Sequence, residues 1–129
     1  ESCGNSSENR NWNISAYCGA VSAGAAAGAG IAYLCGGGYD EVIHTVVNAL
    51  AIVSGMVCDG AKASCAAKIA SSVDAGILGY NMYLNGQQFY AGDGIVTKGV
   101  EATIGNIGRL GKDGMRETNE DIIKMVIEE

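Results

Sequence analysis

The chain has 129 residues, of which 20 are glycine and none is proline, and its formal net charge is −6. This length suits one domain with a single core, and a hydrophobic content of 48% excludes a disordered tail or linker. The acidic balance argues against nucleic acid as the main partner, because phosphate binding requires clustered positive charge. The absence of proline, the strongest helix breaker, favours helices.

Residues 1–13 are polar and are predicted to form a flexible lead-in or domain junction, which leaves 14–129 as the folded domain. From Ile14 to about Leu34 we expect a buried helix rich in glycine and alanine. The charge-free run 14–39 is long enough to span a bilayer, but its small residues gain little from lipid, so we favour a protein with no membrane span. A stripe of small residues in this helix would let another backbone approach closely: Ala20, Gly24, Gly28 and Ala32.

A second helix is expected from Asp40, its N-cap, because the apolar residues that follow recur with the helical period. A short connection over 55–60 precedes a third helix of about 61–84, for which Asp59 is a candidate N-cap. The predicted core face of this third helix consists of larger apolar residues and two alanines: Ala66, Ile69, Ala70, Val73, Ile77, Tyr80 and Leu84.

After a loop over 85–96, Thr97 is predicted to cap a fourth helix that ends at Gly111. Thr118 and Asp121 resemble a capping box that opens a last, short helix. No alternating strand pattern or hairpin signal competes with these helices. The sequence therefore predicts an all-α fold, a compact bundle of about five helices with a buried first helix.

The five cysteines stand at positions 3, 18, 35, 58 and 65. An odd count argues against a secreted disulfide scaffold and favours a reducing cytoplasm, with some cysteines as metal ligands. Cys58 and Cys65 fall on roughly one side of the third helix at its N-terminal end, and Cys18 falls near the start of the first. If those two helix ends meet, three thiolates converge where helix dipoles favour negative charge. Soft thiolates select zinc, copper(I) or iron–sulfur clusters.

A structural interpretation of the same cysteines is also open. Free cysteine is among the most buried residue types, the chain has no CxxC motif, and no common ferredoxin spacing matches. Spacing alone favours simple core packing for any single one of them. Cys3 is expected to be exposed, and Cys35 is expected to fill space at a helix end.

One long segment of the chain reads Asn48-Ala-Leu-Ala-Ile-Val-Ser-Gly-Met-Val-Cys-Asp-Gly-Ala-Lys-Ala-Ser-Cys-Ala-Ala-Lys68. This segment resembles a signature of the L-cysteine desulfidases, a family similar to the alpha subunit of iron–sulfur L-serine dehydratase. Three further segments resemble the same family: Tyr17-Cys-Gly-Ala, Leu34-Cys-Gly-Gly-Gly and Ile107-Gly-Arg-Leu-Gly-Lys-Asp-Gly-Met115. The resemblance begins at about residue 14. It covers only the C-terminal, cluster-binding part of a family whose members are several times longer.

This resemblance implies a 4Fe–4S cluster with Cys18, Cys58 and Cys65 as ligands, an iron open to substrate, and no pyridoxal phosphate. It implies a lyase that performs β-elimination on L-cysteine, giving pyruvate, ammonia and sulfide, with the open iron as Lewis acid toward the leaving group. Dehydration of L-serine is the alternative, and a chain that ends at Glu129 without a cysteine favours the desulfidase branch. An aerobic preparation would lose the cluster.

The same resemblance places the proton-abstracting base in a missing N-terminal catalytic region, so no catalytic residue is assigned here and this chain alone is expected to be inactive. Lys62 and Asn48 are candidate substrate-binding residues. Lys62 follows Cys58 closely and would steer a substrate carboxylate, although a solvated lysine explains it equally well. A non-catalytic, partner-binding helical domain with an exposed apolar patch is the competing function. Association into a homo-oligomer is left open.

Overall fold

The computed structural model describes residues 15–128, so the lead-in 1–13 and Cys3 lie outside the described residues. The described chain forms five α-helices, and a π-helical turn, Leu110–Gly114, joins the last two. Between residues 15 and 128 the only β-type pairing is a single bridge, so the predicted all-α class is confirmed. The helices are α1 (Gly19–Leu34), α2 (Tyr39–Ile52), α3 (Ser64–Leu84), α4 (Val100–Arg109) and α5 (Arg116–Ile127).

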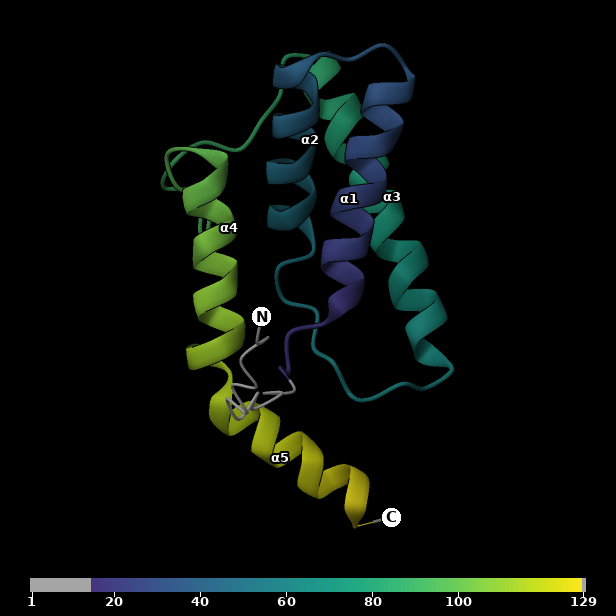
Figure 1. Cartoon of the computed structure of the whole chain (residues 1–129), viewed down its shortest axis with the longest axis vertical. Coiled ribbons are helices and arrows are strands. Elements are labelled where there is room, and N and C mark those ends of the chain that lie inside the picture. The colour runs from purple at the N-terminus through teal and green to yellow at the C-terminus, as the bar shows by residue number, and fades with distance from the viewer. Residues whose placement is uncertain (1–14, 129) are drawn as a thin grey trace, which may run out of the picture.

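Three helices form the body of the molecule (Figure 1). α1 and α3 run in the same direction and pack against each other, while α2 runs the opposite way and packs against both. α4 lies beside α2, and α5 leaves the bundle at an angle beyond the end at which α1 and α3 begin. The N-terminal ends of α1 and α3 therefore lie at one end of the bundle, which is the condition under which the cysteines near them could converge.

α1 touches α3 through backbone rather than through side chains. The four small residues of the predicted stripe, Ala20, Gly24, Gly28 and Ala32, are all buried. A Cβ atom built on Gly28 would lie 2.7 Å from the Cα atom of Gly76, and one built on Gly24 would overlap the backbone of Ser72. The close approach expected from the sequence is confirmed, and only glycine fits at these two positions of α1.

The predicted core face of α3 is wrong. The residues buried on this helix are small: Ser72, Ala75, Gly76 and Gly79. Ile69, Ile77 and Leu84 are instead 47%, 40% and 57% exposed. Because α1 approaches so closely, larger side chains cannot lie between the two helices and are displaced to the flank of α3. We call this flank the lateral stripe, which comprises Ala66, Ile69, Ala70, Val73, Ile77, Tyr80 and Leu84.

The first and third helices begin later than predicted. α1 starts at Gly19 rather than at Ile14, because residues 15–18 form extended chain that pairs with residues 56–58. α3 starts at Ser64 rather than at about residue 61. Asp59 is therefore not its N-cap and has a different partner, which is described below.

Three predicted caps are also wrong. Gly38, not Asp40, precedes α2, and its backbone N–H donates to the Glu41 carboxylate at 2.8 Å. Gly99, with a φ angle of +96°, precedes α4 in place of Thr97. Glycine suits this position because other residues rarely adopt positive φ. α5 already begins at Arg116, so Thr118 lies inside it. Along the described residues, no helix combines the length and apolar content that a bilayer span requires.

Candidate metal centre

A short backbone pairing brings Cys18 and Cys58 together. The backbone N–H of Cys18 donates to the Met56 carbonyl at 3.2 Å, and the N–H of Cys58 donates to the Ala16 carbonyl at 2.6 Å. Both thiols belong to one apolar cluster, in which Cys18 is 4% exposed and Cys58 is partly buried. Two cysteines that are distant in the sequence therefore lie on neighbouring, paired segments at the end of the bundle where α1 begins.

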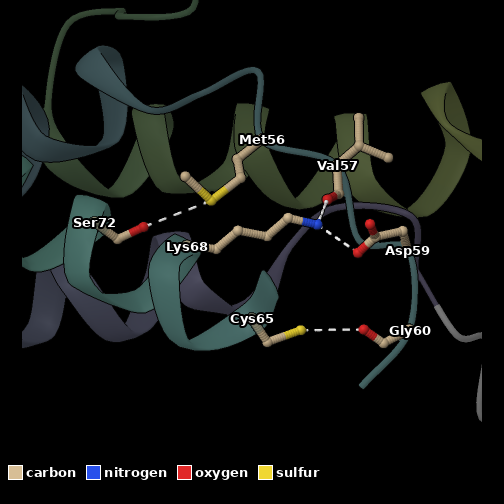
Figure 2. A network of polar contacts seen from close by, with 7 residues as sticks. All are labelled: Met56, Val57, Asp59, Gly60, Cys65, Lys68 and Ser72. Carbon is tan, nitrogen blue, oxygen red and sulfur yellow. Dashed lines mark hydrogen bonds and ion pairs between the residues drawn. The ribbon is translucent and has the colours of Figure 1, made fainter. Parts of the chain in front are cut away.

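Lys68 of α3 holds the chain on both sides of Cys58. Its ammonium donates to the Val57 carbonyl at 3.0 Å and also contacts the Asp59 carboxylate (Figure 2). Val57 and Asp59 are the two neighbours of Cys58 in the chain. Lys68 was not singled out from the sequence, although it closes the family-like run.

Two more side chains of α3 contact the same connection on neighbouring turns (Figure 2). The Cys65 thiol donates to the Gly60 carbonyl at 3.1 Å, one turn before Lys68. The Ser72 hydroxyl donates to the Met56 sulfur at 3.7 Å, one turn after it. One face of α3 thus fixes residues 56–60, and residues 16–18 pair with the start of that segment.

The ion pair between Lys68 and Asp59 keeps both groups charged. The hydrogen bond from Lys68 is the main reason why the pKa of Asp59 is lowered. The same bond is the main cause of a raised pKa for Lys68, and the thiols of Cys18 and Cys65 raise it further. A positive charge therefore lies within electrostatic range of these two cysteines. This charge is paired with the Asp59 carboxylate.

Tyr17, next to Cys18, is a second residue that the sequence did not reveal. Its phenol oxygen is buried and has no hydrogen-bond partner among the described residues. Burial raises the pKa of Tyr17, and the nearby Cys18 raises it further. A buried hydroxyl without a partner is costly, so this oxygen is an unsatisfied group in the segment that carries Cys18.

A cavity of about 190 Å³ opens beside Cys58. Its other wall is α5, which contributes mainly branched apolar side chains, so the lining is largely apolar. This volume can hold a small molecule next to the thiol. The lining residues are Cys58, Gly60, Asn119, Ile122, Ile123, Val126 and Ile127.

The remaining predicted site residues do not gather with these cysteines. Lys62 is exposed on the connection between Cys58 and Cys65. Asn48 is fully buried in α2, where its side-chain amide donates to the Gly79 carbonyl at 3.0 Å and accepts from the Phe89 N–H at 3.1 Å. Both ends of this amide are occupied within the protein, so it holds α2, α3 and the following loop together.

Cys35 lies at the opposite end of α1 and is exposed, so the prediction that it fills space is wrong. The four cysteines of residues 15–128 are free thiols, namely Cys18, Cys35, Cys58 and Cys65. Within that range no three histidine, cysteine, aspartate or glutamate side chains form a group that would hold a single metal ion. A four-iron cluster is larger than one ion, so its ligand sulfurs stand further apart. Soft thiols are the donors that such a cluster requires.

The fold and the site thus define an all-helical domain that carries three cysteines near the N-terminal ends of α1 and α3. The model of one family, described as the serine dehydratase alpha chain, matches residues 4–124. The chain belongs to this family. No solved structure is significantly similar.

Several relatives are named only as UPF0597 proteins. The chain is 68% identical to one from Desulfitobacterium hafniense over 114 residues, covering 88% of this chain and 26% of the relative. It is 55% identical to one from Lachnoclostridium phytofermentans, covering 88% and 27%, and 52% identical to one from Finegoldia magna, covering 89% and 28%. The chain therefore spans about a quarter of the length of these curated relatives.

Proposed function

We propose that this chain is the cluster-binding domain of a lyase that eliminates the β-substituent of a small L-amino acid, with Cys18, Cys58 and Cys65 as ligands of a 4Fe–4S cluster. The observation that carries the proposal is the family match, which extends over residues 4–124 and includes all three cysteines. The adjacent positions of Cys18 and Cys58 in one apolar cluster support it. When bound, the cluster supplies a Lewis acid for the leaving group.

Features of the described residues fit such a group. Cys65 lies at the start of α3, beyond an exposed connection, and uses its thiol only in a hydrogen bond to Gly60. The unpartnered phenol of Tyr17 would donate to an acceptor beside Cys18. The apolar cavity next to Cys58 would exclude water from a bound substrate. Lys62, which is exposed and follows Cys58 by four residues, remains our candidate for holding the substrate carboxylate. Asn48 is buried and both ends of its amide are hydrogen-bonded within the protein.

L-Serine and L-cysteine differ only in the leaving group, which is hydroxide or thiolate. The name of the matched family favours L-serine, while the motif resemblance favours L-cysteine. Both substrates would give pyruvate and ammonia, and only L-cysteine would also release sulfide. We place the base that removes the α-proton in the part of the protein outside this chain.

The full-length parent protein, prepared and loaded with iron and sulfide without oxygen, tests this function. We expect pyruvate from L-serine or L-cysteine, with sulfide only from the latter, and no turnover by residues 1–129 alone. A loaded parent that releases no pyruvate from either substrate would contradict the proposed function. Turnover by the isolated chain would instead contradict our placement of the base.

We further propose that the lateral stripe of α3 is where the remainder of the longer protein docks. The stripe is an apolar helix face without a partner in the described residues, and Ile69, Ile77 and Leu84 are each at least 40% exposed. About three quarters of each curated relative lies outside the matched region, since this chain covers 26–28% of them. Exposed apolar patches of this kind mark interaction sites.

A charged substitution on the stripe tests the docking. In the full-length parent, Ile77→Glu is expected to lower the free energy of unfolding by about 1–3 kcal/mol, because it buries a charged side chain without a partner in the docked interface. Limited proteolysis and thermal unfolding would detect the loosened contact. Ser71→Glu is the matched control, because Ser71 is exposed on α3 away from the stripe. Equal behaviour of the two variants would show that the stripe faces solvent in the whole protein.

A further inference from the structure

Cys58 stands in a connection that contains no helix, and Lys68 is the side chain that contacts this connection on both sides of it. The Lys68 ammonium donates one hydrogen bond to the carbonyl of Val57, at 3.0 Å, and another to the carboxylate of Asp59. We propose that Lys68 is the positioning residue that fixes the place and direction of the Cys58 thiol. Where this concerns cluster binding, the proposal rests on the proposed function.

An isolated ion pair on a protein surface contributes little energy and therefore restrains the positions of its two side chains only weakly. Lys68 differs because one of its two partners is a backbone carbonyl, which fixes the chain itself, and because its own side chain is only 21% exposed. The ammonium is charged at neutral pH, so its bonds to the Val57 carbonyl and to the Asp59 carboxylate are both charge-assisted. Charge-assisted hydrogen bonds of this kind are stronger than neutral ones.

The contacts around Lys68 explain why this restraint acts on Cys58 in particular. Cys65 reaches Gly60 and Ser72 reaches Met56, so neighbouring turns of α3 hold the outer parts of the same connection. Lys68 holds the middle of it. The pairing of residues 16–18 with 56–58 restrains the backbone N–H of Cys58 and places Val57 opposite Tyr17, but it leaves Asp59, the other chain neighbour, without a restraint of its own.

Removing the ammonium is therefore expected to make the backbone around Cys58 more mobile and its thiol more accessible, without unfolding α3. In the iron-free full-length parent, Lys68→Met keeps the aliphatic length and loses both bonds. We expect the Cys58 thiol to react with iodoacetamide about tenfold faster, as measured by peptide mass spectrometry, the factor that one lost charge-assisted bond corresponds to. Amide hydrogen exchange over residues 56–60 should rise with it.

Further variants make the test specific. Lys68→Arg keeps the charge and the donors and should restore slow alkylation, and Asp59→Asn should give an intermediate rate because the Val57 contact survives. Lys98→Met, at the opposite end of the bundle, is the control for loss of one lysine and should match wild type. Iron content after anaerobic loading should fall in Lys68→Met and recover in Lys68→Arg.

Wild-type rates of alkylation and of amide exchange in Lys68→Met would overturn the proposal. The same holds if Lys68→Arg shows alkylation and exchange rates as high as those of Lys68→Met. If the wild-type parent takes up no iron while Lys68→Met still frees Cys58, the positioning role stands and the proposed function fails. The two claims are thereby tested separately.

Discussion

Replacing Gly24 by alanine is expected to lower the free energy of unfolding by about 2–3 kcal/mol, although alanine favours helices over glycine by roughly 1 kcal/mol. The added methyl group would overlap the backbone of Ser72, and backbone cannot move aside as a flexible side chain can. α1 and α3 must separate to admit it. Urea denaturation followed by circular dichroism measures the change.

Gly30→Ala is the matched control on the same helix. A Cβ atom at Gly30 meets nothing within 4 Å, so the substitution gains helix propensity without a clash. We expect it to stabilise the chain by roughly 0.5–1 kcal/mol. If both variants shift the denaturation midpoint in the same direction, the backbone contact between α1 and α3 is not the determinant that we describe.

Replacing Cys58 by serine is expected to abolish cluster binding in the full-length parent. Serine keeps the size of the side chain but loses the soft thiolate that iron–sulfur clusters require. Iron and sulfide content, together with the visible absorption of the anaerobically loaded protein, should fall to background. Cys18→Ser and Cys65→Ser should behave in the same way.

Cys35→Ser provides the matched control for this second prediction. Cys35 is exposed at the far end of α1, away from the paired ends where Cys18 and Cys58 meet. Its variant should retain wild-type iron. Full iron content in Cys58→Ser, or an equal loss in Cys35→Ser, would refute the ligand assignment.

The all-α class and the buried small-residue stripe of α1 could be predicted from the sequence, because apolar spacing and small-residue stripes are local signals. That the N-terminal ends of α1 and α3 lie together could only be posed as a condition. The buried face of α3 could not be predicted. Large residues at helical spacing suggested one core face, but the close approach of α1 selected the face with Ser72 and Gly76. Small residues at 72, 75, 76 and 79 follow the same period and carried the better signal.

Of the candidate site, too, only some residues could be predicted from the sequence. Cys58 and Cys65 were identified from a long motif and Cys18 from a separate short segment that resembles the same family. The ligand roles of all three stay a prediction. Lys68 and Tyr17 were missed because their environment depends on the pairing of residues 16–18 with 56–58, which no local pattern encodes. Asp59 was assigned to a helix cap because an acidic residue before a helix usually has that role, whereas its partner is Lys68.

The bridge between Tyr17 and Val57 also has a consequence for the order of assembly. α1 and α2 lie in the chain between these two residues, so the bridge closes a long loop. Closing a long loop is entropically costly and is compensated only once intervening structure has formed. We therefore expect the segments that carry Cys18 and Cys58 to stay apart in the unfolded and newly made chain, and to pair only after α1 and α2 have packed.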